Sequence, residues 1–218
     1  MLKLDLHVHS AYSRDSKSSL EEINEAARHA GLDGYALVDH DTVEGLEPAL
    51  ESAGDLLVVP GVEVTARGCH ILALGVQERV QPGMNMAETV DQIHGLGGLA
   101  VLAHPYGMPT HWFSLRMAPH AGFDAVEVVN SAQFPCRLVQ WLNRRLADRL
   151  GLPGVGGSDS HIPSTVGRAY TLVDARERTV EGVLEAIKEG RVRSRGSCTT
   201  GWERLVKVWR QLVWRANK

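Results

Sequence analysis

Six histidines in this chain border short apolar runs of strand length, and this arrangement constrains the fold more than any other feature. They are His7, His9, His40, His70, His104 and His161. The first two lie in the segment LDLHVHS at residues 4–10, where alternate residues of a strand face the same way. We therefore expect both imidazoles to project from one face of the first strand, near the end at which α/β folds build their sites.

Residues that could bind a metal also stand next to the later apolar runs. The runs at residues 35–38, 56–59, 99–103 and 154–156 lead to Asp39-His40-Asp41, Glu63, His104 and Asp159-Ser160-His161, and the run at 71–74 is preceded by His70. Helical periodicity separates these runs, with helices predicted up to Gly31, at 42–53 with Thr42 as N-cap, at 86–96, at 135–150 and from 180 to Gly190. Strands that alternate with helices predict parallel pairing and a barrel-like α/β fold with its ligands at one rim.

Composition favours one globular domain. The 218 residues are 44% hydrophobic and 22% charged, and the net charge of −3 gives no overall footprint for nucleic acid. The three cysteines Cys69, Cys136 and Cys198 form no CxxC pair, which predicts no disulfide framework and a reducing compartment. The first residues lack the long apolar region of a signal peptide and no run reaches transmembrane length, so we expect a cytoplasmic protein.

The candidate ligands suit more than one metal ion. Imidazole and carboxylate groups bind Zn²⁺, Mn²⁺ and Fe²⁺, and six histidines with Asp15, Glu63 and Asp159 exceed what one tetrahedral ion can use. Two ions can share a hydroxide and clamp a phosphoryl group during in-line displacement, and Glu63 is the natural bridge between them. The reaction class that fits best is phosphoester hydrolysis.

The motifs together resemble the PHP family, the polymerase and histidinol phosphatase superfamily of metal-dependent phosphoesterases. In chain order they are DLHVHS at 5–10, YSRDS at 12–16, VDHDT at 38–42, PGVEV at 60–64, His104-Pro105 and GSDSH at 157–161. Residues 166–171 and 188–192 resemble the closing segment of the family. The resemblance implies a distorted seven-stranded (β/α) barrel over residues 1–195 with two or three divalent metals, Mn, Fe or Zn, at its C-terminal rim.

Residue by residue, the resemblance implies nine metal ligands. They are His7, His9, Asp15, His40, Glu63, His70, His104, Asp159 and His161. Asp39 and Asp41 flank one of these histidines and are expected to orient ligands or cap a helix.

For the mechanism we expect a metal-bridging hydroxide as nucleophile. Asp159 or a metal-bound water is the candidate proton donor to the leaving group, and Arg14 and Arg168 are candidates to hold the substrate phosphate by forked donation. The expected substrate is a small phosphomonoester or a nucleotide. The alternatives are a nuclease or exonuclease that acts on nucleic-acid ends, a histidinol-phosphate phosphatase, and a non-catalytic metal-binding regulatory module.

Residues 196–218 are expected to form an amphipathic helical tail. Its apolar stripe consists of Trp202, Leu205, Val206, Trp209, Leu212 and Val213. Three roles are consistent with this pattern: docking on the barrel, interaction with a partner or a second copy, and binding to an anionic membrane surface.

Overall fold

The computed structural model describes residues 1–107, 112 and 114–216, and the side chains of these residues except 207 and 210–216. The strands are β1 Leu2–Val8, β2 Gly34–Leu37, β3 Leu57–Ala66, β4 Cys69–Leu74, β5 Leu99–Ala103, β6 Ala125–Asn130, β7 Gly154–Gly157, β8 Ala169–Val173 and β9 Val192–Gly196. The α-helices are α1 Leu20–His29, α2 Leu46–Ser52, α3 Met86–Gly95, α4 Cys136–Leu150, α5 Val180–Lys188 and α6 Gly201–Ala216. Short 3₁₀ turns lie at η2 Ser114–Arg116, η3 Ala118–His120 and η4 Pro163–Thr165.

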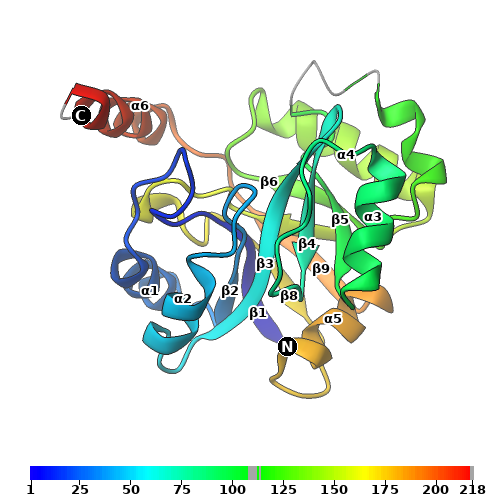
Figure 1. Ribbon diagram of the computed structural model, residues 1–218. Coiled ribbons are helices and arrows are strands. Elements are labelled where there is room, and N and C mark those ends of the chain that lie inside the picture. Colours follow the sequence, from blue (N-terminus) through cyan, green and yellow to red (C-terminus); the bar gives the residue numbers. More distant parts are fainter. Residues whose placement is uncertain (108–111, 113, 217–218) are drawn as a thin grey trace.

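The strands form one curved sheet that nearly closes into a barrel (Figure 1). Its order is β7-β6-β5-β4-β3-β2-β1-β8-β9. The first and seventh strands approach each other at their carboxyl ends, where the amide of Asp159 donates to the carbonyl of His7 over 2.8 Å and that of His9 to Ser160 over 3.0 Å. The predicted distorted barrel is therefore confirmed, and β8 and β9 extend the sheet beyond the seven strands that close.

The expected parallel pairing does not hold in two parts of the sheet. β3, β4 and β5 pair antiparallel, and β8 pairs antiparallel with both β1 and β9. Between β3 and β4 the chain turns at Arg67 and Gly68, and Gly68 takes a φ of 84° that favours glycine. A two-residue turn leaves no room for a crossover helix, so this hairpin interrupts the alternation of strand and helix.

Local capping explains most helix boundaries. α1 begins after a capping box in which the Ser19 hydroxyl and the Glu22 carboxylate satisfy each other's backbone amides. The prediction that Thr42 caps the second helix is wrong, because α2 begins only at Leu46 after Gly45. The Asp41 carboxylate is bonded to the amide and hydroxyl of Thr65 at 2.7 and 2.8 Å, which holds this stretch against β3 as a turn.

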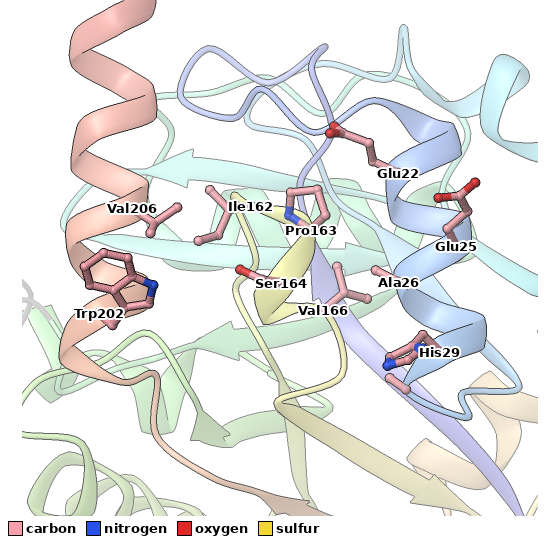
Figure 2. A pocket seen from close by; sticks show the side chains of 11 residues that line it. Glu22, Glu25, Ala26, His29, Ile162, Pro163, Ser164, Val166, Trp202 and Val206 are labelled. Carbon is pink, nitrogen blue, oxygen red and sulfur yellow. The ribbon is translucent and has the colours of Figure 1, made fainter.

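The C-terminal helix α6 contacts the barrel through polar groups, whereas its apolar side chains stay exposed. Trp202, Leu205 and Trp209 are 75%, 63% and 63% exposed. A hollow of about 750 Å³ separates Trp202 and Val206 from helix α1 (Figure 2). Trp202, Leu205 and Trp209 of the predicted apolar stripe are therefore not buried against the barrel; the side chains of Leu212 and Val213 lie outside the described part of the chain. None of the described helices combines the length and the apolar character that crossing a bilayer requires.

A disulfide joins Cys136, at the start of α4, to Cys198, after β9. The prediction of a chain without disulfides is wrong, because the fold brings together two cysteines that lie 62 residues apart in sequence. Disulfides persist mainly in oxidising environments, so the cysteines no longer support the predicted cytoplasmic location. Cys69 is a buried free thiol.

Reduction of this disulfide is expected to lower the free energy of unfolding by about 4 kcal/mol, because a crosslink across 62 residues removes much loop-closure entropy from the unfolded chain. Urea unfolding with and without dithiothreitol measures the difference. The double variant Cys136→Ser/Cys198→Ser is the control, since reductant should leave its midpoint unchanged. Equal midpoints for the oxidised and reduced protein would contradict the prediction.

Candidate metal centre

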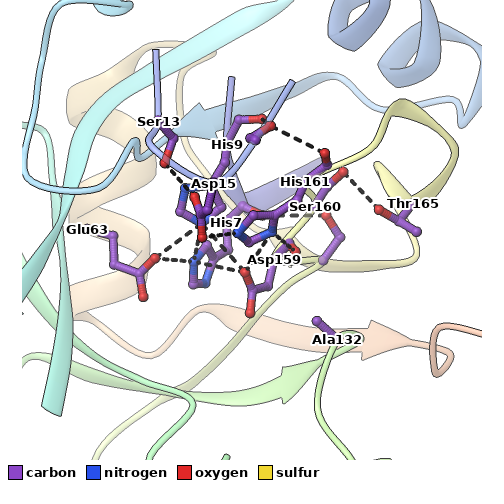
Figure 3. Close-up of polar contacts among 12 residues, drawn as sticks. His7, His9, Ser13, Asp15, Glu63, Ala132, Asp159, Ser160, His161 and Thr165 are labelled. Carbon is purple, nitrogen blue, oxygen red and sulfur yellow. Dashed lines mark hydrogen bonds and ion pairs between the residues drawn. The ribbon is translucent and has the colours of Figure 1, made fainter. Parts of the chain in front are cut away.

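The nine predicted ligands come together at the rim of the barrel where β1, β2, β5 and β7 end. Figure 3 shows six of them: His7, His9, Asp15, Glu63, Asp159 and His161. His7 lies in β1 and His9 follows it, while His40, His104 and the pair Asp159 and His161 follow β2, β5 and β7. Asp15 reaches the site from the loop after β1, and Glu63 and His70 come from the β3–β4 hairpin. The closest groups of donor atoms are His9, Asp15, His40 and His161; His7, His9 and Glu63; His7, His104 and Asp159; and His40, Glu63 and His70.

Glu63 lies at the centre of this cluster, and its two carboxylate oxygens face different imidazoles. Oε2 lies 3.0 Å from Nε2 of His7, 3.1 Å from Nε2 of His9 and 3.5 Å from Nε2 of His40. Oε1 lies 2.9 Å from Nδ1 of His70 and 3.0 Å from Nε2 of His104. A carboxylate placed between two sets of nitrogen donors has the geometry of a bridge between two ions.

Two aspartates, Asp15 and Asp159, complete the cluster. Asp159 Oδ1 lies 3.5 Å from Nε2 of His9 and 3.4 Å from Nδ1 of His161. Asp15 Oδ2 lies 2.9 Å from Nε2 of His161 and 3.5 Å from Nε2 of His40. These contacts define a further group of donors that does not include Glu63, so the arrangement has room for a third ion.

The donor set fits divalent metals in both chemistry and spacing. Ligand bonds of about 2.0–2.2 Å in tetrahedral geometry place neighbouring donor atoms about 3.3 Å apart. The Nε2 atoms of His7 and His9 are 3.0 Å apart, and the distances around Glu63 and Asp159 are of the same size. Burying so many carboxylates and imidazoles together costs folding free energy unless cations compensate their charge. A cluster with a purely structural role would avoid this cost.

Charge pairing dominates the protonation of the metal-free cluster. Burial by itself raises the pKa of the Glu63 carboxyl, but His7, His104 and His70 outweigh this effect and hold that pKa well below its ordinary value. Burial is likewise outweighed at Asp159 by His7 and His9, so its pKa is also well below the usual range. Conversely, the pKa of His9 rises to about 9, because hydrogen bonds to Asp159 and Glu63 overcome the opposing effect of burial.

Glu127 in β6 orients the centre, and sequence reasoning missed it. Its Oε1 accepts from Nδ1 of His7 at 2.9 Å, which leaves Nε2 of that ring directed at Glu63. Its Oε2 accepts from the amide of His104 at 2.9 Å and from Nδ2 of Asn130 at 3.0 Å. A glutamate inside the apolar segment AVEVVN was the available signal, but this segment was not recognised as a strand.

Asp5 and Gly157 hold β1 and β7 together beneath the ligands. The buried Asp5 carboxylate accepts from the amides of Ser158 and Gly167, both at 2.8 Å, and burial raises its pKa to about 6. A Cβ added at Gly157 would lie 2.3 Å from Cβ of His7, so only glycine permits this approach. The two strands therefore set the distance between His7 and Asp159 by direct backbone contact.

The two aspartates beside His40 and the two candidate arginines have different partners at the rim. Asp39 accepts from the amide and the hydroxyl of Ser10, both at 2.6 Å, and so positions the residue beside His9. Arg14 is 62% exposed and lies 3.5 Å from Asp41. The Arg168 guanidinium forms an ion pair with Glu203 of α6, with Nε 2.9 Å from Oε1, so the structure ties it to the C-terminal helix.

Comparison with known proteins links this geometry to a family. Residues 5–111 match the family model of the PHP domain, and residues 141–192 match the PHP-associated model. An uncharacterized protein of Methanocaldococcus jannaschii is 33% identical over 142 residues, which cover 60% of this chain and 82% of that protein. The phosphoribosyl 1,2-cyclic phosphate 1,2-diphosphodiesterase of Eggerthella lenta is 43% identical over 83 residues, which cover 34% of this chain and 31% of that enzyme.

A solved structure supports the fold. A two-domain protein of Bacteroides vulgatus, described as containing a predicted PHP-like metal-dependent phosphoesterase, matches with a TM-score of 0.72 at 21% identity. The match covers 90% of this chain and 65% of that one. The two family models and the relative matched over most of its length show that this chain belongs to the PHP family.

Proposed function

We propose that this protein is a metal-dependent phosphoesterase that hydrolyses a small phosphoester. The observation that carries the proposal is the Glu63 carboxylate, whose two oxygens face separate sets of imidazoles at distances of 2.9–3.5 Å. The proposed ligands are the nine residues His7, His9, Asp15, His40, Glu63, His70, His104, Asp159 and His161, which would hold two or three divalent ions. Bound divalent metals supply Lewis-acid activation of water and of the phosphoryl oxygens.

The protein's own residues would position the reacting groups. Glu63 fixes the separation of the two donor sets, and Glu127 fixes the ring of His7. Arg14, exposed at the rim, is the proposed contact to a phosphoryl oxygen. The pKa of Asp159 lies well below the usual range because of His7 and His9, which favours the ionised carboxylate that a metal ligand needs.

The proposed substrate class rests on the net charge of the protein and on one relative. The Eggerthella lenta relative is named for a cyclic phosphate diester of a sugar, which favours a small sugar phosphoester over a nucleic acid. The net charge of −3 gives little support to a nucleic-acid groove. Nuclease activity and histidinol phosphate hydrolysis are the competing outcomes of a substrate panel.

Metal removal is expected to abolish turnover. Protein purified without chelator should contain two or three metal equivalents by elemental analysis and hydrolyse bis-p-nitrophenyl phosphate. Chelation or His9→Ala should lower turnover at least 100-fold, because His9 belongs to two of the donor groups. His94→Ala is the matched control, since His94 pairs with Asp124 outside the cluster. Unchanged turnover in His9→Ala would contradict the proposal.

Metal affinity is expected to rise with pH between about 7 and 9. His9 in the metal-free protein has a pKa of about 9, so a proton must leave its ring before a metal can bind. Below pH 9, each decrease of one pH unit should therefore weaken the apparent metal affinity by up to about tenfold, because more of the His9 rings carry a proton. Calorimetry in buffers of different ionisation enthalpy counts the protons released. Affinity that does not change with pH, with no proton release, would be inconsistent with ligation by His9.

Glu127 is expected to act as a positioning residue. Glu127→Gln would place an amide N–H₂ against the donors of His104 and Asn130, or turn it toward His7, so one hydrogen bond must be lost in either orientation. We expect metal affinity to fall about 10–100-fold. Glu185→Gln on the exposed face of α5 is the control. A variant that keeps wild-type metal affinity would exclude this role.

A further inference from the structure

A small pocket of about 200 Å³ opens beside the candidate metal centre. Asp159 and His161 line one side, and Thr199, Arg204 and Val208 of the C-terminal segment line the other. Figure 3 shows Ala132 and Thr165, two further wall residues, on the side of Asp159 opposite to Glu63. The pocket therefore begins at two candidate ligands and extends away from the centre of the cluster.

The C-terminal wall is held rigidly against the barrel. The amide of Thr199 donates to the carbonyl of Ser131 at 2.9 Å, next to the Cys136–Cys198 disulfide. The Arg204 guanidinium donates to the carbonyl of Ala132 at 2.8 Å and to that of Gln133 at 2.9 Å.

Glu203 adds a second attachment of this wall. It accepts from the amide of Thr200 at 2.8 Å and forms the ion pair with Arg168. These bonds explain why helix α6 presents its polar side to the barrel, and they fix the size of the pocket.

We propose that this pocket receives the leaving group of the phosphoester and accepts a single sugar or polyol unit. The inference rests on the proposed function: the pocket opens at Asp159 and His161, two of the candidate ligands, so the ester substituent of a phosphoryl group held at the cluster can enter it. Pockets for drug-sized ligands measure about 300–1,000 Å³, so this smaller pocket of about 200 Å³ suits a single ring better than a nucleoside or a strand.

The wall chemistry matches a hydroxyl-bearing group. Thr165 and Thr199 contribute hydroxyl groups, and Ala132, Ile162 and Val208 contribute apolar surface. Arg204 uses two N–H groups for the carbonyls of Ala132 and Gln133, and a guanidinium carries five. Further N–H groups can therefore donate to a hydroxyl oxygen of the leaving group.

A graded substrate panel tests the proposal. The metal-loaded protein is assayed with glycerol 3-phosphate, ribose 5-phosphate, a nucleoside monophosphate, a phosphorylated dinucleotide and bis-p-nitrophenyl phosphate. We expect kcat/KM for the two small esters to exceed that for the nucleotides at least tenfold. A kcat/KM for nucleotides as high as that for ribose 5-phosphate would overturn the proposed leaving-group subsite.

Two filling variants supply an independent readout. Ala132→Phe and Val208→Phe narrow the pocket from opposite walls, and Val208 is 52% exposed, so its replacement should not disturb folding. Both should weaken binding of the methylene phosphonate analogue of ribose 5-phosphate at least tenfold by calorimetry, with binding of inorganic phosphate unchanged. Ala87→Phe, at an exposed position of α3 outside the pocket, is the control.

The outcomes separate the two levels of the proposal. Equal losses for the phosphonate and for inorganic phosphate, or no loss for either, would overturn the leaving-group subsite while the phosphoesterase function stands. Absence of metal-dependent turnover with every ester, bis-p-nitrophenyl phosphate included, would overturn the proposed function itself.

Discussion

The buried carboxylate of Glu63 is the interaction on which the rest of the site depends. Five imidazoles lie within 3.5 Å of its two oxygens, and the pairing keeps a fully buried carboxyl ionised. A charge in this position is stable only while its partners stay in place. The surrounding fold therefore has to fix ring positions as well as backbone positions, and Glu127 and Asp39 do so from outside the cluster.

Closure of the sheet provides that rigidity. The ligands come from positions as far apart as His7 and His161, so a centre exists only when the carboxyl ends of β1 and β7 meet. Asp5 bonds to the amides of Ser158 and Gly167, and the absence of a side chain at Gly157 lets β7 approach β1. His104 and Asp159 take φ values of 28° and 55°, which are unusual for residues with side chains and occur where the backbone serves a site.

The sequence predicts the fold class and the convergence of the nine candidate side chains at one rim, because both depend on short-range patterns. Strand-length runs ending in histidine or carboxylate mark β1, β2, β5 and β7, and helical periodicity marks α1, α3, α4 and α5. The antiparallel pairing of β8, the disulfide and the pairing of Arg168 with Glu203 escaped prediction. These features depend on contacts between distant segments, and no local pattern carries information about such contacts.

The hairpin between β3 and β4 makes the centre sensitive to insertion and deletion. Glu63 and His70 belong to the same hairpin, and their distance of 2.9 Å follows from a register in which Thr65 faces His70 across a two-residue turn. Successive residues of a strand alternate between its two faces, so one added residue that shifted this register would turn His70 to the opposite face. Length changes at this turn therefore keep His70 beside Glu63 only in steps that preserve the alternation, so the turn matters to the centre although neither Arg67 nor Gly68 belongs to the donor groups.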